Sequence, residues 1–177
     1  MLDYENFKCV LKKDLQKSIE DIVNNSPDTF GLAILLGEDI NMLYPFLVSI
    51  TERQIQDINA RWRDEGQYIP DEWPNWHKGL LKDSEEEFKK IFGDFKRKFP
   101  HENDDCTYTE EELSFMSDMY KIYLQIMMDL REKDFLKEIP FVIIYTSDCD
   151  RPFMYESVIA LNSGVHKQKA IEIYKED

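Results

Sequence analysis

The chain has 177 residues, a size typical of one folded domain, and 42% of them are hydrophobic, which is enough to build a core. Aspartate and glutamate number 36 against 22 lysines and arginines, so the formal net charge is -14. A field of that sign repels phosphate backbones and anionic lipid surfaces. The composition therefore predicts one globular domain over residues 1–177 that binds neither nucleic acid nor a membrane.

Cysteine usage and the N-terminus indicate the compartment. Cys9, Cys106 and Cys149 lie far apart and form no Cys-x-x-Cys pair, which argues against a disulfide framework and favours a reducing compartment. The first residues mix charges into the apolar pattern, unlike the hydrophobic segment of a signal peptide. No run approaches the roughly 20 apolar residues that span a bilayer. We therefore expect a cytoplasmic protein.

The first third of the chain predicts a helix followed by a hairpin. Apolar residues at steps of three and four indicate a helix from residue 3 to about residue 25, ended by the residues around Pro27. Two aliphatic runs, 30–36 and 42–50, then predict two strands joined by a short loop. Pro45 has no N–H for a ladder, so we expect it at an edge or a bulge.

Capping boxes mark three further helix starts. In this motif a Ser or Thr hydroxyl accepts from the third helical N–H, and a Glu or Gln side chain accepts from the backbone N–H of the cap residue. The pairs are Thr51 with Gln54, Ser84 with Glu87, and Thr109 with Glu112. The helix after Thr109 has the widest apolar arc, which predicts a central position.

The last part of the chain adds one strand and two helices. The β-branched run 141–146 predicts a strand buried on both faces that joins the hairpin. Asp148 or Asp150 is expected to cap a helix ending near Asn162, and a last helix is expected over 165–174. The order of elements predicts the α+β class, with a small, mostly antiparallel sheet (a hairpin plus one late strand) packed by several helices.

Residues 61–77 hold all three tryptophans in an otherwise polar stretch. Tryptophan and arginine are enriched at interface hot spots, so this segment is a candidate recognition surface. Alternatively, the indoles fold back as plugs over the sheet and fix a long connection, as large aromatic side chains usually do. The sequence leaves both interpretations open.

One family resemblance rests on this region. An N-terminal helix, the strand pair FGLAILLGEDINMLYPFLVSIT, the helix TERQIQDINARW and the following DEWPNW together resemble the uncharacterised bacterial family catalogued as domain of unknown function 4303. The resemblance covers most of the chain but rests chiefly on residues 30–76. Members are suggested to act as immunity proteins beside polymorphic toxins, so it implies toxin neutralisation and brings no catalytic residues. The positions similar to the family pattern are Arg61, Trp62, Glu72 and Trp73, and together with Trp76 they are the candidate partner-binding residues.

Between residues 101 and 118 the chain carries seven acids and no lysine or arginine. The acids are Glu102, Asp104, Asp105, Glu110, Glu111, Glu112 and Asp118. They could face a basic partner, or they could be a solvated loop and a helix N-terminus whose dipole favours acids.

Motifs for chemistry are missing. His77, His101 and His166 have no metal-ligand spacing, and no phosphate-binding loop occurs, so we predict no metal and no cofactor. A nucleophile built from Cys106 or Cys149 with a histidine is conceivable, but free cysteines are usually buried hydrophobes. No catalytic residue is assigned.

We therefore expect a cytosolic, acidic protein-binding module, and the resemblance implies an immunity protein that neutralises a toxin. The acidic charge of the chain suits a basic toxin as that partner. The alternative is a hydrolase or transferase with a pocket between sheet and helices that no linear motif reveals. A structural or regulatory adaptor is a third reading.

Overall fold

The computed structural model describes residues 2–37, 40–62, 65–100, 107–146 and 151–175, apart from the side chains of Met42, Trp62 and Arg151. Within these ranges there are six α-helices, namely α1 (Glu5–Asn25), α2 (Glu52–Trp62), α3 (Lys82–Lys98), α4 (Glu110–Glu132), α5 (Arg151–Leu161) and α6 (Gly164–Tyr174). The described strands are β1 (Thr29–Leu36), β2 (Phe46–Thr51), β3 (Asn75–His77) and β4 (Phe141–Thr146). Short 3-10 turns are η1 (Ile40–Met42), η2 (Gly66–Tyr68) and η3 (Pro70–Glu72). The predicted α+β class is confirmed.

The strands form one mixed sheet in the order β3-β2-β1-β4. The β1–β2 and β2–β3 pairs are antiparallel, and β4 lies parallel to β1. The hairpin and the late strand are thus confirmed, and the sheet is mostly antiparallel as predicted. Strand β3 was not predicted, because three residues are too few to show a period of two.

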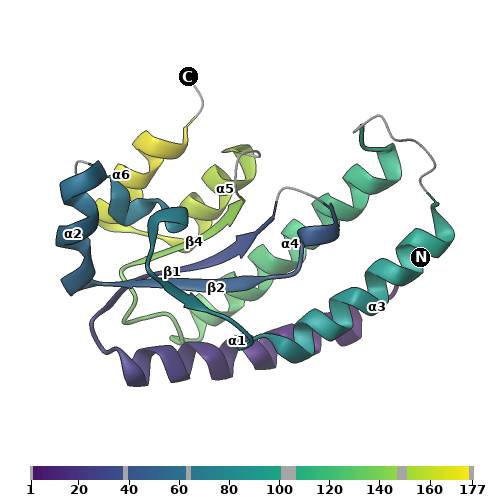
Figure 1. Cartoon of the computed structure of the whole chain (residues 1–177), viewed down its shortest axis with the longest axis horizontal. Coiled ribbons are helices and arrows are strands. Elements are labelled where there is room, and N and C mark those ends of the chain that lie inside the picture. Colours follow the sequence, from purple (N-terminus) through teal and green to yellow (C-terminus); the bar gives the residue numbers. More distant parts are fainter. Residues whose placement is uncertain (1, 38–39, 63–64, 101–106, 147–150, 176–177) are drawn as a thin grey trace.

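Helices cover both faces of the sheet. Figure 1 shows α1, α3 and α4 on one side and α2, α5 and α6 on the other. In β1, Leu32 and Ile34 pack into the core on the α1 side, while Ala33 and Leu35 pack into the core on the α5 side. Because successive side chains of a strand alternate between faces, a strand buried on both sides is apolar throughout. This accounts for the unbroken apolar runs in β1 and β4.

Helix α4 buries a wide apolar arc in the core on the α1 side, including Phe115, Met119 and Met127. Its capping box is present: the Glu112 N–H donates to Thr109 Oγ1 at 3.2 Å, and the Thr109 N–H donates to Glu112 Oε2 at 2.9 Å. Farther along, the fully buried Tyr123 donates its hydroxyl proton to the Leu43 carbonyl at 2.6 Å. This bond ties the helix to the chain just before β2.

The other two predicted capping boxes differ from expectation. Helix α3 begins at Lys82, ahead of Ser84, and Ser84 donates from both its backbone N–H and its hydroxyl to Asp14 of α1 at 2.9 and 2.7 Å. The prediction that Ser84 caps α3 is wrong, because a partner on another helix takes its hydroxyl. Thr51 ends β2, and its N–H donates to Gln54 Oε1 at 3.0 Å, which is half of the expected box. Pro45 precedes β2 and so lies outside the sheet.

The two edges of the sheet are treated differently. Along β4, the Asn162 side chain accepts from the Val142 N–H at 2.8 Å and donates to the Val142 carbonyl at 2.6 Å. Ser157 of α5 makes the equivalent contacts with the Ile144 N–H and carbonyl, both at 3.2 Å. Side chains thus replace a fifth strand at this edge. The other edge is the short strand β3, where the sheet faces a groove.

Among the described helices, none is both long enough and apolar enough to cross a membrane. The residues expected to cap α5, Asp148 and Asp150, lie outside the described residues.

Candidate partner-binding groove beside strand β3

The structure separates the two tryptophans that precede and form β3. Trp73 is 1% exposed, and its ring lies 6.2 Å from that of Phe141, edge to face. Its indole N–H donates to the Gly66 carbonyl at 3.3 Å. Trp73 therefore plugs the sheet on the α5 side and offers a partner no indole surface.

Trp76 lies in β3, opposite Val48 of β2, and 45% of its surface is exposed. Its indole N–H donates to the Trp73 carbonyl at 3.0 Å. An exposed tryptophan is usually free to rotate, but this bond holds the indole against a buried neighbour. Trp76 is thus a fixed aromatic surface at the open edge of the sheet.

The remaining candidates are placed as follows. Arg61 is exposed near the end of α2, and Glu72 is half-buried in η3. The Trp62 side chain lies outside the described residues. Neither Arg61 nor Glu72 lines the groove that Trp76 lines. Of the four candidates whose side chains the structure describes, Trp73 is buried and only Trp76 lines the groove, so the fold does not gather these four into one surface.

The groove beside Trp76 has a volume of about 700 Å³ and lies between the C-terminal part of α1 and the β3 region. Its lining residues are Asp21, Ile22, Asn25, Ser26, Trp76, His77, Lys78 and Leu80. Leu80 is 36% exposed, so two large apolar side chains reach solvent here. Sequence reasoning missed the contribution of α1, because only the fold brings residues about 50 positions apart in sequence together.

A serine and a histidine meet behind the groove. Ser49 Oγ of β2 lies 2.8 Å from His77 Nε2, and burial lowers the pKa of His77, so that the imidazole is neutral at pH 7. Such a pair resembles a nucleophile with its base. Ser49, however, is only 1% exposed, and no described acid contacts the other ring nitrogen. As it stands, the pair fastens β3 to β2.

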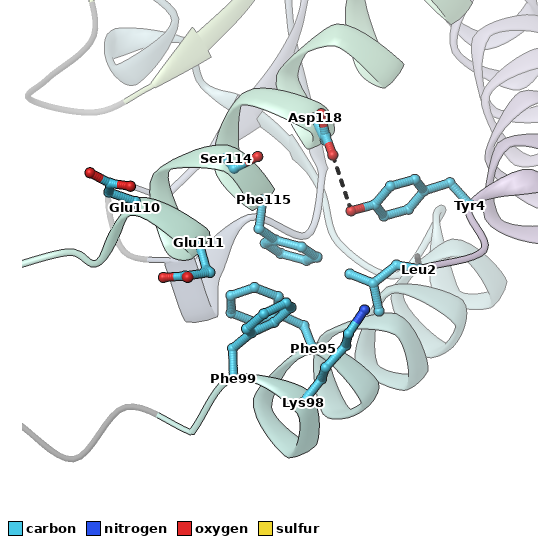
Figure 2. Close-up of a pocket in the computed structure, with 10 residues that line it drawn as sticks. All are labelled: Leu2, Tyr4, Phe95, Lys98, Phe99, Glu110, Glu111, Ser114, Phe115 and Asp118. Carbon is cyan, nitrogen blue, oxygen red and sulfur yellow. Dashed lines mark hydrogen bonds between the residues drawn. The ribbon is translucent and has the colours of Figure 1, made fainter.

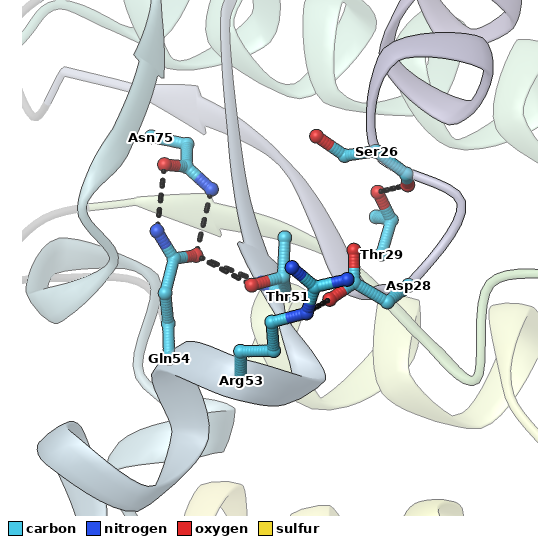
Figure 3. Close-up of polar contacts among 7 residues, drawn as sticks. All are labelled: Ser26, Asp28, Thr29, Thr51, Arg53, Gln54 and Asn75. Carbon is cyan, nitrogen blue, oxygen red and sulfur yellow. Dashed lines mark hydrogen bonds and ion pairs between the residues drawn. The ribbon is translucent and has the colours of Figure 1, made fainter.

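A polar network fixes the start of β3 (Figure 3). Asn75 and Gln54 exchange two hydrogen bonds of 3.0 and 2.8 Å through their side-chain amides. Gln54 Oε1 also accepts from Thr51, so α2, β2 and β3 are held at one point. Nearby, Arg53 pairs with Asp28 at 3.0 Å. Strand β3, which borders the groove, is therefore fastened at its start to α2 and β2.

A further cleft of about 410 Å³ lies between η2 and α6 and is lined by Glu65, Tyr68, Lys169, Glu172 and Ile173. Beside it, His166 Nδ1 lies 3.0 Å from the Tyr68 hydroxyl, and burial together with Lys169 lowers the pKa of His166. Tyr174 donates to the Tyr68 carbonyl at 2.5 Å. These contacts fasten α6 to η2.

Candidate metal and thiol groups are placed only in the part of the chain that the structure describes. There, no three His, Cys, Asp or Glu side chains come together in a way that could hold a metal ion. Cys106 and Cys149, considered above as nucleophiles, lie outside the described residues, and Cys9 is exposed on α1.

Comparison of the chain with family models, with curated proteins and with solved structures found no match. The resemblance described above therefore stays a prediction that rests on residues 30–76.

Proposed function

We propose that this chain is an acidic protein-binding module, and that the groove between α1 and β3 receives its partner. Following the resemblance, the partner is a toxin that the chain neutralises. The observation that carries the proposal is the exposed but fixed indole of Trp76 at the open edge of the sheet.

Pre-organisation makes Trp76 a favourable anchor. Binding normally costs the entropy of ordering a side chain, and the hydrogen bond to the Trp73 carbonyl has already restrained this one. Tryptophan is also the residue type most enriched at interface hot spots. Leu80, on the same groove, adds apolar surface beside it.

The charge of the molecule favours a basic partner. With a formal net charge of -14, the chain attracts positively charged proteins over distances longer than contact. Steering of this kind accelerates association, whereas the groove contacts determine dissociation.

The direct test measures binding to the product of the gene next to the one that encodes this chain. Trp76→Ala is expected to weaken binding by about 30-fold or more, because hot-spot truncations cost about 2 kcal/mol or more. Val165→Ala on α6, where Val165 is 56% exposed, is the matched control and should change affinity less than about twofold. Higher salt should slow association without greatly changing dissociation. Equal affinity of the Trp76→Ala variant and the wild type would refute the groove as the binding site.

The Ser49–His77 contact favours one alternative, a hydrolase. If the pair is catalytic, opening of the groove must expose Ser49, and Ser49→Ala should abolish hydrolysis of an activated ester such as p-nitrophenyl acetate. An unchanged rate in Ser49→Ala excludes this serine as the nucleophile.

A further inference from the structure

A second cleft, of about 330 Å³, lies at the opposite end of α1 from the groove. The helix has 21 residues, so the two sites are about 30 Å apart along it. Here Leu2 and Tyr4 meet the end of α3 and the start of α4 (Figure 2). The volume is at the lower limit of ligand pockets and suits one side chain rather than a larger molecule.

Aromatic rings form the wall of this cleft. Phe95 and Phe115, each 2% exposed, stack with centroids 4.6 Å apart. Phe99 lies 5.4 Å from Phe95, and Tyr4 lies 6.5 Å from Phe115. Phe95 and Phe115 are buried, whereas Phe99 is only partly buried. Because ring faces carry negative electrostatic potential, the Phe99 ring can attract a cation at this wall.

Three carboxylates, those of Glu110, Glu111 and Asp118, also line the cleft. Glu110 and Glu111 belong to the first turn of α4, where the helix dipole alone would favour acids. Asp118 lies beyond that turn and is not accounted for in this way. It accepts from the Tyr4 hydroxyl at 3.4 Å (Figure 2), and burial together with Asp118 raises the pKa of Tyr4 to about 12, so that the phenol stays protonated.

A lysine of the chain itself, Lys98, already contacts one of these rings. The ammonium Nζ of Lys98 lies 5.2 Å from the centroid of Phe99, within the range of a cation–π contact. Lys98 is exposed, and no salt bridge joins it to any carboxylate that the structure describes. Its ammonium can therefore swing into solvent at low cost and leave the cleft to another cation.

The surroundings favour a protein over a free amine as the source of that cation. Leu2 and Phe99, which line the cleft, are only partly buried, so apolar surface reaches solvent around it. Apolar surface around an anchoring pocket excludes water from it when a protein binds, whereas a small amine would leave that surface uncovered.

We propose that this cleft receives the ammonium or guanidinium group of a basic side chain of a protein partner, which takes the place of Lys98. The assignment rests on the proposed protein-binding function and adds a second contact about 30 Å from the groove, on a chain with a net charge of -14.

The test titrates the isolated chain with a tetra-arginine peptide and follows backbone amide shifts by NMR. The shifts should centre on the start of α4 and the end of α3, and a tetra-citrulline peptide, which has the same shape without charge, should produce none. Asp118→Asn should weaken binding by about threefold to tenfold, as expected for loss of one partly buried charge contact. Glu132→Gln, which removes an equal charge at the far end of α4, should weaken it less than twofold.

Lys98→Met provides a test in the opposite direction. Removal of the internal competitor should strengthen peptide binding by about twofold to fivefold, whereas Lys82→Met at the other end of α3 should have a smaller effect. The proposal is overturned if Asp118→Asn and Glu132→Gln act alike, if Lys98→Met does not strengthen binding, or if spermidine shifts the same amides while the peptide does not.

These titrations need no natural partner, so their failure would leave the groove proposal untouched. Conversely, a partner that binds normally to the Trp76→Ala variant would refute the groove without changing the peptide results.

Discussion

Trp73 and Trp76 are three residues apart and both donate an indole hydrogen bond to a backbone carbonyl, yet they differ in burial, which determines the effect of a truncation. Trp73 has a buried ring, a buried hydrogen bond and a close contact with the sheet, whereas Trp76 is almost half exposed. Because both residues lie in the same polar segment, 61–77, the sequence does not distinguish their burial. Burial, which sequence does not report directly, decides between the plug and the recognition surface for each indole separately.

We predict that Trp73→Ala lowers the free energy of unfolding by about 3–5 kcal/mol, because it leaves a large cavity over β1 and β4, where the indole packs. Trp76→Ala should cost about 1 kcal/mol or less, as surface substitutions do. Urea denaturation of the two variants measures both values. Similar losses in the two variants would contradict the assigned burial.

Gly31 explains how the Trp73 ring fits on the sheet. A Cβ at position 31 would lie 2.6 Å from one carbon of the indole and 3.0 Å from a methyl group of Ile50. Glycine in a strand often marks such a close approach, so this signal was present in the sequence. A glycine in a strand indicates that another group approaches the backbone, but only the fold shows that this group is the Trp73 ring.

Gly31→Ala should therefore destabilise the protein by about 1–3 kcal/mol, as overpacked core substitutions do. Gly93, inside α3, is the matched control: a Cβ there meets nothing closer than Arg97 at 3.8 Å. Gly93→Ala should stabilise by about 0.5–1 kcal/mol through helix propensity and the entropy of the unfolded chain. Thermal unfolding that shifts in the same direction for both variants would contradict the contact.

At the scale of elements, α5 acts as the cover of a sheet edge. Asn162 and Ser157 satisfy the backbone groups of Val142 and Ile144 that a fifth strand would otherwise pair. A covered edge cannot pair with a strand of another chain, so the β4 edge is closed to such pairing, whereas the β3 edge is not covered in this way. The helix itself was predicted, but its role as a cover depends on its position against β4.

Asn162→Leu should leave both Val142 groups without partners, at a cost of about 1–3 kcal/mol for each buried group. Hydrogen exchange should show the amide of Val142 losing protection before the amides of β1. Asn24→Leu, at an exposed position of α1, is the control and should change stability by no more than about 0.5 kcal/mol. A Val142 amide that stays protected in the Asn162→Leu variant would contradict the claim that Asn162 covers the β4 edge.

Across the whole molecule, two histidines link stability to pH. Burial lowers the pKa of His77 and of His166 below the ordinary value of 6.5. Between the folded pKa and 6.5 the unfolded chain binds more protons, so acid favours unfolding. The stabilisation is therefore fully present above pH 6.5 and is lost as the pH falls through the folded pKa values.

We expect the urea midpoint to fall between pH 7.5 and pH 5.5, and to fall less in a His77→Gln, His166→Gln double variant. The comparison removes the contribution of the many carboxylates, which both proteins share. An equal loss in the two proteins would contradict the pKa shifts.

The α+β class, the wide apolar arc of α4, the hairpin and the late strand followed from the sequence, because helical and strand periods and the Thr109 cap are local signals. Three features came from tertiary structure alone: Asp14 takes the hydroxyl of Ser84, β3 forms from three residues, and α1 joins Trp76 to make a groove. Each depends on groups far apart in sequence, whose proximity is settled by packing. Composition and period determine what each segment can become, whereas burial and partners at a distance decide which side chains remain at the surface.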